Sequence, residues 1–165
     1  MSPDSGLAGQ PSSSTAVGQN ITLHIGVLEQ PYRSNSKTAV SISTGDVASI
    51  LEAKYGLFTA FYKMYEQRIA DGLATSMQGA IEAMMMGHSI DPWGAGMQQI
   101  QRDFRDFISS RQAERAGITG TPTKAALRGV NHRLAHPYRK SNPRRPSFLD
   151  TGLLMSSGRA WITVG

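Results

Sequence analysis

A long stretch of helical periodicity between Phe58 and Met85 constrains the fold more than any other feature of the sequence. Apolar residues recur there at spacings of three and four over about seven turns, as along one face of an amphipathic helix. These positions are Phe58, Phe61, Tyr62, Tyr65, Ile69, Leu73, Met77, Ala80, Ile81, Met84 and Met85. Because packing of the apolar face supplies most of a helix's stability, the stripe predicts a helical core or a subunit interface.

Two shorter helices are expected on either side of the long one. The first covers residues 47–55, with Asp46 as its N-cap and Gly56 directly after its end. The second covers residues 97–116, and its period assigns Asp103 to the outward, polar side.

A fourth helix is expected in the C-terminal half. Thr121-Pro122 is typical of a cap followed by proline at the first helical position, and His136-Pro137 is typical of a helix end. The inward positions of this helix would be Ala126, Leu127, Val130 and Leu134.

Three segments have the pattern of β-strands. Residues 21–28 alternate with period two and place His24 on the face opposite the apolar positions. Residues 38–43 are a candidate for a second short strand, and residues 160–164 for a final one. With the helices, these strands predict a single α+β domain over residues 21–165.

The N-terminal arm and the overall composition limit which structures and sites the chain can form. Residues 1–20 are rich in Ser, Gly and Pro, so we expect an extended arm that is flexible alone or ordered by neighbouring subunits. The absence of cysteine excludes disulfides and thiolate metal sites. No run approaches the roughly 18 to 20 apolar residues of a membrane span, and no signal peptide pattern is present, so we expect assembly in the cytoplasm without a membrane.

Positive charge is concentrated in one segment. Residues 111–145 carry nine Lys or Arg against one acid, Glu114, which gives +8 within a chain of net charge +5. The cations are Arg111, Arg115, Lys124, Arg128, Arg133, Arg139, Lys140, Arg144 and Arg145. Such a segment can face nucleic acid, an acidic protein or solvent. Tyr138 beside these cations suits stacking on a base, but no nucleic-acid-binding motif accompanies them, which favours a solvated or protein-facing loop.

The triplet Asp150-Thr151-Gly152 admits two interpretations. It occurs in aspartic proteases, where two such loops bring two carboxylates together to activate water. A single copy would need a homodimer, and Leu153 and Leu154 would place bulky groups beside the carboxylates. We therefore favour a structural role, in which Asp150 caps a short turn over residues 153–157 and Gly152 supplies backbone freedom.

Two histidines suggest a metal site only weakly. His132 and His136 are four apart on the expected fourth helix and could approach one ion. The neighbouring cations would repel a metal, and no third ligand stands out. The sequence thus predicts no metal, no cofactor and no enzymatic activity.

The residues Arg144-Arg145-Pro146-Ser147-Phe148-Leu149-Asp150-Thr151-Gly152-Leu153-Leu154, followed by Ser156-Ser157 and a strand, carry a resemblance. This stretch resembles the tail-completion and neck proteins of tailed bacteriophages, in which proline, an apolar pair, Asp-Thr-Gly, leucine and serine precede a β-strand. Thr121-Pro122-Thr123-Lys124, the run 24–28 and the run 47–56 are similar to this family as well.

The resemblance implies a small antiparallel sheet packed on helices and a role as a structural virion protein. Such proteins form rings, commonly hexameric, between head and tail, as a tail terminator, a head-completion protein or a tail adaptor. Their partners are other neck, portal-adaptor or tail-tube proteins and DNA in the channel. The expected interface residues here are Arg139, Lys140, Arg144, Arg145, Asp150, Thr151, Gly152, Leu153 and Trp161.

Overall fold

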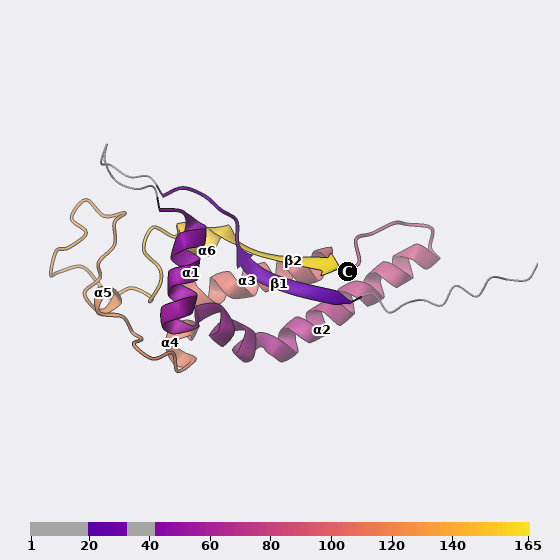
Figure 1. Cartoon of the computed structure of the whole chain (residues 1–165), viewed down its shortest axis with the longest axis horizontal. Coiled ribbons are helices and arrows are strands. Elements are labelled where there is room, and N and C mark those ends of the chain that lie inside the picture. The colour runs from indigo at the N-terminus through magenta and orange to yellow at the C-terminus, as the bar shows by residue number, and fades with distance from the viewer. Residues whose placement is uncertain (1–19, 33–41) are drawn as a thin grey trace, which may run out of the picture.

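The computed structural model describes residues 20–32 and 42–165 of the chain. In chain order these residues form β1 (Ile21–Val27), α1 (Thr44–Tyr55), α2 (Leu57–Met85), α3 (Gly94–Ser109), α4 (Gln112–Arg115), α5 (Lys124–Leu127), α6 (Leu153–Ser157) and β2 (Gly158–Val164), as Figure 1 shows. The expected arm, apart from Asn20, and residues 38–41 of the candidate second strand lie outside the described residues. At the end of that candidate strand, Ser43 forms an isolated bridge with Pro31.

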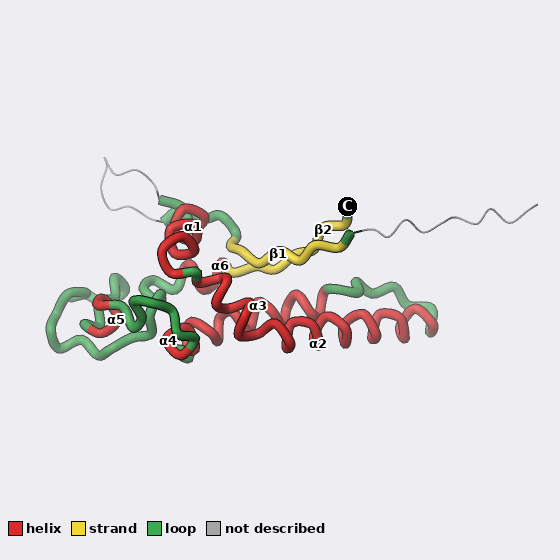
Figure 2. The backbone as a smooth tube through the Cα atoms, turned by 60° about the horizontal axis from the view of Figure 1, so that its bottom comes forward, coloured by secondary structure: helices red, strands yellow, loops and turns green. Residues whose placement is uncertain are grey.

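The two ends of the chain pair with each other in an antiparallel sheet. Ile21 lies opposite Val164, and Val27 lies opposite Gly158. Reciprocal backbone hydrogen bonds between Asn20 and Gly165, of 3.1 and 3.0 Å, extend the ladder beyond the strands. The sheet forms one layer and α2 with α3 forms another (Figure 2). The predicted first and last strands and the α+β class are confirmed, with the last strand starting two residues earlier than expected, at Gly158.

An aromatic cluster between α2 and α3 forms the centre of the core. Phe61, Phe104 and Phe107 are each at most 2% exposed. The ring of Phe61 packs edge-on against Phe104 with centroids 5.3 Å apart, and Phe58 stacks on Phe104 at 5.1 Å. Because aromatic rings bury large apolar areas, this cluster joins the two helices beneath the sheet.

Helix α2 has the predicted length, but its apolar stripe is only partly buried. Phe61 and Ile69 are buried, whereas Met84 and Met85 are 72% and 85% exposed. Figure 1 shows the reason, since the end of α2 projects beyond the sheet. We call the exposed apolar residues at this end the methionine tip: Ile81, Met84, Met85, Met86 and Ile90. Within the described ranges, no helix is both long enough and apolar enough to cross a membrane.

The first helix begins at a different cap from the predicted one. Ser43, not Asp46, is the N-cap, and its hydroxyl accepts the N–H of Asp46 at 3.1 Å. The Asp46 carboxylate accepts the backbone N–H of Ser43 at 2.9 Å, which completes a capping box and, with the hydroxyl of Ser43, holds the pKa of Asp46 below its usual value. The end at Gly56 is confirmed, because this glycine has a φ of 61°.

The helix expected over residues 97–116 is interrupted. Helix α3 ends at Ser109, and Arg111 takes a left-handed φ of 62° before α4 begins. The break reorients α4, so that its Ala113 is fully buried and its Glu114 faces residues 144–147. Periodicity does not reveal this break, because tertiary contacts of α4 favour it.

Asp103 lies on the inward side of its helix, so the prediction of an outward position is wrong. The residue is only 3% exposed, and its carboxylate accepts a hydrogen bond from Nε of Arg68 at 2.8 Å. This contact joins α3 to α2. The cation compensates the buried carboxylate, which is why a charged residue is tolerated on the inward side.

The expected fourth helix is reduced to one turn. Thr123, rather than Thr121, caps α5 by accepting the N–H of Ala126 at 3.2 Å. The chain then turns at Gly129, which has a φ of 65° and lies against the backbone of Asn142 and Pro143. Ala126 is buried as predicted, but Leu127 and Leu134 are 50% and 42% exposed.

Candidate functional site

Glu114 anchors the segment that enters the Asp-Thr-Gly turn. Its Oε1 accepts the backbone N–H of Ser147 at 3.0 Å and the hydroxyl of Ser147 at 2.9 Å. Its Oε2 forms an ion pair with Arg144. The Glu114 side chain is 8% exposed and Ser147 is 1% exposed, so their mutual bonds are largely shielded from solvent, whereas Arg144 on the other side is 43% exposed.

These bonds determine the charge state of the Glu114 carboxyl group. Burial acts to raise its pKa, but the hydrogen bonds from Ser147 and Arg144 stabilise the carboxylate more strongly. The pKa of Glu114 is therefore below its usual value. At neutral pH this carboxylate is a fixed negative charge within the basic segment.

The side chain of Arg145 binds the backbone of its own chain. Its guanidinium donates hydrogen bonds to the carbonyl oxygens of Val130, Pro146 and Leu149. Burial lowers the pKa of Arg145, which the Asp150 carboxylate partly counteracts. Because this guanidinium satisfies three carbonyls of an irregular segment, its first role is to hold that segment together.

Asp150 binds a histidine instead of capping the following turn. One carboxylate oxygen accepts the backbone N–H of His132 at 3.0 Å, and the other lies 2.6 Å from its Nδ1. Nε2 of the same ring lies 2.9 Å from the hydroxyl of Tyr138. Asp150 thereby ties the loop over residues 128–142 to the Asp-Thr-Gly turn. The group that faces it is an imidazole, whereas an aspartic protease needs a second carboxylate.

The prediction that Asp150 is the cap of the short helix is therefore wrong. Gly152, with a φ of 79°, is the N-cap of α6 and has no side chain to accept a hydrogen bond. Thr151 takes over part of this role, since its hydroxyl accepts the N–H of Leu153 at 3.3 Å. The expected backbone freedom at Gly152 is confirmed by its positive φ.

A cavity of about 250 Å³ lies beside the turn. Arg145, Asp150 and Thr151 line it together with apolar residues of α1 and with Tyr32. Burial raises the pKa of Tyr32, while a hydrogen bond with the Leu154 backbone lowers it in part. The cavity is smaller than the roughly 300 to 1,000 Å³ of a typical small-molecule site, so it suits an ion or a side chain better than a cofactor.

The two histidines with a spacing suited to metal binding do not share a helix. Both follow the end of α5, and His132 already contacts Asp150 and Tyr138, while His136 is exposed. In residues 20–32 and 42–165, no three His, Cys, Asp or Glu side chains are grouped so that they could hold a metal.

The predicted interface residues fall into three groups. Arg145, Asp150, Thr151 and Gly152 line one cavity, Leu153 begins the adjoining α6, and Arg144 pairs with Glu114. Arg139 and Lys140 are exposed on the loop before the Asp-Thr-Gly turn. Trp161 lies in β2 and stacks on His24 of β1, with ring centroids 5.2 Å apart and planes 9° apart, so its contacts belong to the sheet.

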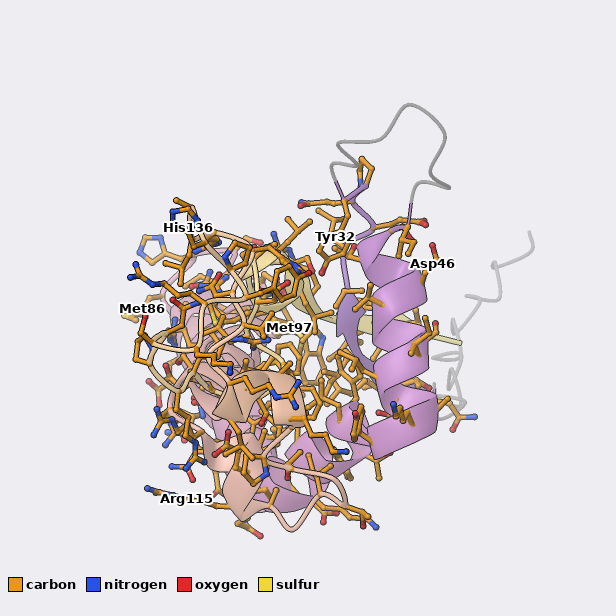
Figure 3. The ribbon with its side chains drawn as sticks, turned by 90° about the vertical axis from the view of Figure 1, so that its left-hand side faces the viewer. Tyr32, Asp46, Met86, Met97, Arg115 and His136 are labelled. Carbon is orange, nitrogen blue, oxygen red and sulfur yellow. The ribbon has the colours of Figure 1, made fainter. Side chains whose placement is uncertain are left out.

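One end of the molecule is a cationic surface. In the described part of the chain, no acidic side chain forms an ion pair with the exposed Arg128, Arg133, Arg139 or Lys140. We call these four residues, with Leu127, Leu134 and Tyr138, the cationic end. Figure 3 views the molecule from this side and shows His136 and Arg115 at its periphery, with Met97 further inside.

A surface hollow of about 650 Å³ lies at the cationic end. Its lining consists of Ala135, His136, Pro137, Tyr138 and Arg139. Tyr138 is 72% exposed there, although its hydroxyl is held by His132. The hollow thus combines an exposed aromatic ring with a cation, a combination suited to binding a partner side chain.

Sequence reasoning missed Glu114 and Ser147 as organisers of this region. A signal for Glu114 was present, because it is the single acid among nine cations in residues 111–145. Ser147 had no comparable signal, since its role depends on a contact 33 residues away.

Comparisons with protein-family models, with curated proteins and with solved structures found no match for this chain.

Proposed function

We propose that this chain is a structural subunit of a ring at the head-tail neck or tail end of a tailed bacteriophage. In this role it acts in virion assembly and catalyses no reaction. The resemblance from Arg144 to the final strand suggests the family. The proposal extends to a homo-oligomer, commonly hexameric in such rings, that contacts other neck, portal-adaptor or tail-tube proteins.

The observation that carries an assembly role is the amount of large apolar surface left exposed. The methionine tip alone presents Met84, Met85 and Met86 at 70% to 85% exposure. Trp161 and Tyr138, at 45% and 72%, lie on other parts of the molecule. Contiguous exposed apolar groups mark interaction sites on proteins, and several separate ones suit a subunit with more than one neighbour.

The sheet is consistent with the same role. It has two strands within the described residues, so one edge of each strand has no strand beside it there. Open strand edges can pair with another chain, and two-stranded sheets are marginal alone. In the proposed ring, a neighbouring subunit or neck protein covers part of this surface.

The test is to follow assembly directly. Purified protein, with and without its neck neighbours, is examined by native mass spectrometry and electron microscopy. We expect a closed oligomer, or incorporation into particles with cyclic symmetry. A protein that stays monomeric and never enters a particle would exclude the proposal.

A second candidate is a nucleic-acid-binding accessory protein, which the four exposed cations of the cationic end favour. Phosphate contacts by Lys and Arg would make binding strongly salt-dependent. The test variant is Arg139→Ala with Lys140→Ala, because Arg144 and Arg145 have structural contacts. Binding to duplex DNA that the double variant weakens supports this candidate, and absence of binding at low salt removes it.

A further inference from the structure

The methionine tip and the cationic end lie at opposite extremes of the molecule. Figures 1 and 2 show the end of α2 at one extreme of the long axis, and α5 with its following loop at the other. The two surfaces of one copy therefore cannot touch each other. Any contact between them has to join two copies.

Their charges are opposite. Residues 69–101, which form the tip and the helices leading to it, contain three acids and no Lys or Arg. These acids, Asp71, Glu82 and Asp91, are all exposed. In contrast, the cationic end presents Arg128, Arg133, Arg139 and Lys140, none of which is ion-paired in the described part of the chain. Tip-to-tip or cationic-end-to-cationic-end contacts would bring like charges together, so electrostatics selects the unlike pair.

Their apolar groups are complementary as well. The tip projects three consecutive methionines, whose flexible side chains adapt to irregular surfaces. The cationic end offers the hollow beside Tyr138, together with exposed Leu127 and Leu134. A methionine thioether beside an aromatic ring is a favourable contact, so the hollow can receive a side chain of the tip.

We propose that the methionine tip of one copy docks on the cationic end of the next copy. This inference rests on the proposed ring function and specifies which surfaces form the repeating interface. The contact is heterologous, with different surfaces on the two partners. Such contacts close into a ring when the rotation between copies allows it and otherwise extend into a filament.

The absence of cysteine in the native sequence allows a clean test by disulfide trapping. One variant has Met85→Cys in the tip, and another has Ala135→Cys in the lining of the hollow. Both positions are exposed, and neither change alters a charge. Ala74→Cys, on an exposed position of α2 away from the tip residues, is the matched control.

We expect a disulfide-linked dimer when Met85→Cys and Ala135→Cys proteins are mixed under mild oxidation, and no dimer from either alone. Ala74→Cys mixed with Ala135→Cys should give none. Adding Arg139→Glu and Lys140→Glu to the Ala135→Cys protein should lower the yield about tenfold, as a loss of roughly 1.4 kcal/mol in affinity would. Adding Glu82→Lys to the Met85→Cys partner should restore part of the dimer yield.

The possible results test the proposed interface and the proposed function separately. If rings form but the mixed disulfide does not, the interface is wrong and the ring role stands. A Met85→Cys protein that links to itself would likewise overturn it, because the tip would then contact a second tip. If the mixed disulfide forms and the protein never enters a particle, the interface stands and the phage role fails.

Discussion

The cationic end and the methionine tip are stabilised in opposite ways. Most of the tip belongs to the last turns of the regular helix α2, whose backbone is hydrogen-bonded within the helix and through its C-cap Met86, so it projects without much core around it. The cationic end is largely irregular, and its loop is held through Val130 by Arg145 and through His132 by Asp150. Glu114 in turn anchors the following segment at Ser147. Helical structure tolerates exposure, whereas an irregular loop keeps its shape only through specific tertiary bonds.

Among these variants, adding a methyl group at Gly129 should change the free energy of unfolding most. Gly129→Ala would strain a φ of 65° and place a Cβ in overlap with the carbonyl oxygen of Pro143 and about 2.7 Å from that of Asn142. We expect a loss of about 3 kcal/mol in the free energy of unfolding, measured with urea. Gly117→Ala, also at positive φ but with open space around its Cβ, should lose only about 1 kcal/mol. Equal losses would show that the backbone contact at Gly129 is unimportant.

Removal of the Glu114 charge should be the next largest change. Glu114→Gln loses the ion pair with Arg144 and weakens two bonds to the buried Ser147. The expected loss is about 2 kcal/mol, since bonds to charged groups are the stronger ones. The matched variant Glu82→Gln at the exposed tip should stay within about 0.5 kcal/mol. A similar cost at both positions would contradict the contrast between the two ends.

The same carboxyl group should make stability depend on pH in the acid range. Because the folded-state pKa of Glu114 is lowered, its contribution is complete above the usual value of 4.5. It is lost as the pH falls through the lower folded-state value. Urea titrations between neutral and acid pH should therefore show a steeper decline for the native protein than for Glu114→Gln. Parallel curves would mean that Glu114 does not contribute.

The smallest expected effect is a gain in stability from a substitution in α2 close to the methionine tip. Gly79 is an exposed helical glycine with no atom within 4 Å of the point that a Cβ would occupy, so Gly79→Ala meets no obstacle. We expect stabilisation by about 0.8 kcal/mol, because alanine loses less backbone entropy in a helix. Thermal and urea unfolding would check this gain. A loss would indicate that the surface around Gly79 is covered in solution.

Local patterns predicted the elements that depend on local interactions. Both strands, the long helix α2 and the end of α1 at Gly56 follow from periodicity and from glycine's backbone freedom. The prediction of a full fourth helix was wrong because Gly129 permits a turn there, and the backbone of residues 142–143 packs against this glycine. The assignment of Asp103 failed because Arg68, 35 positions away in the sequence, compensates its burial.

The turn at Asp150, within the candidate site, also combines a feature that the sequence predicts with one that depends on tertiary contacts. Its glycine, with positive φ, was predictable from the triplet, whereas the partner of its carboxylate was not. A carboxylate next to a helix start can bind the helix or a distant group, and sequence spacing does not distinguish them. His132 lies close enough only after the loop folds back.

Sequence alone determined that the chain has a long amphipathic helix, two terminal strands and a strongly basic segment, because periodicity and composition are local properties. Tertiary structure decided which cations stay exposed and which are used internally. Arg139 and Arg145 look alike in the sequence, but one is exposed and the other binds backbone carbonyls. It also decided that the stripe of α2 emerges as a methionine tip, since burial depends on where the other elements end.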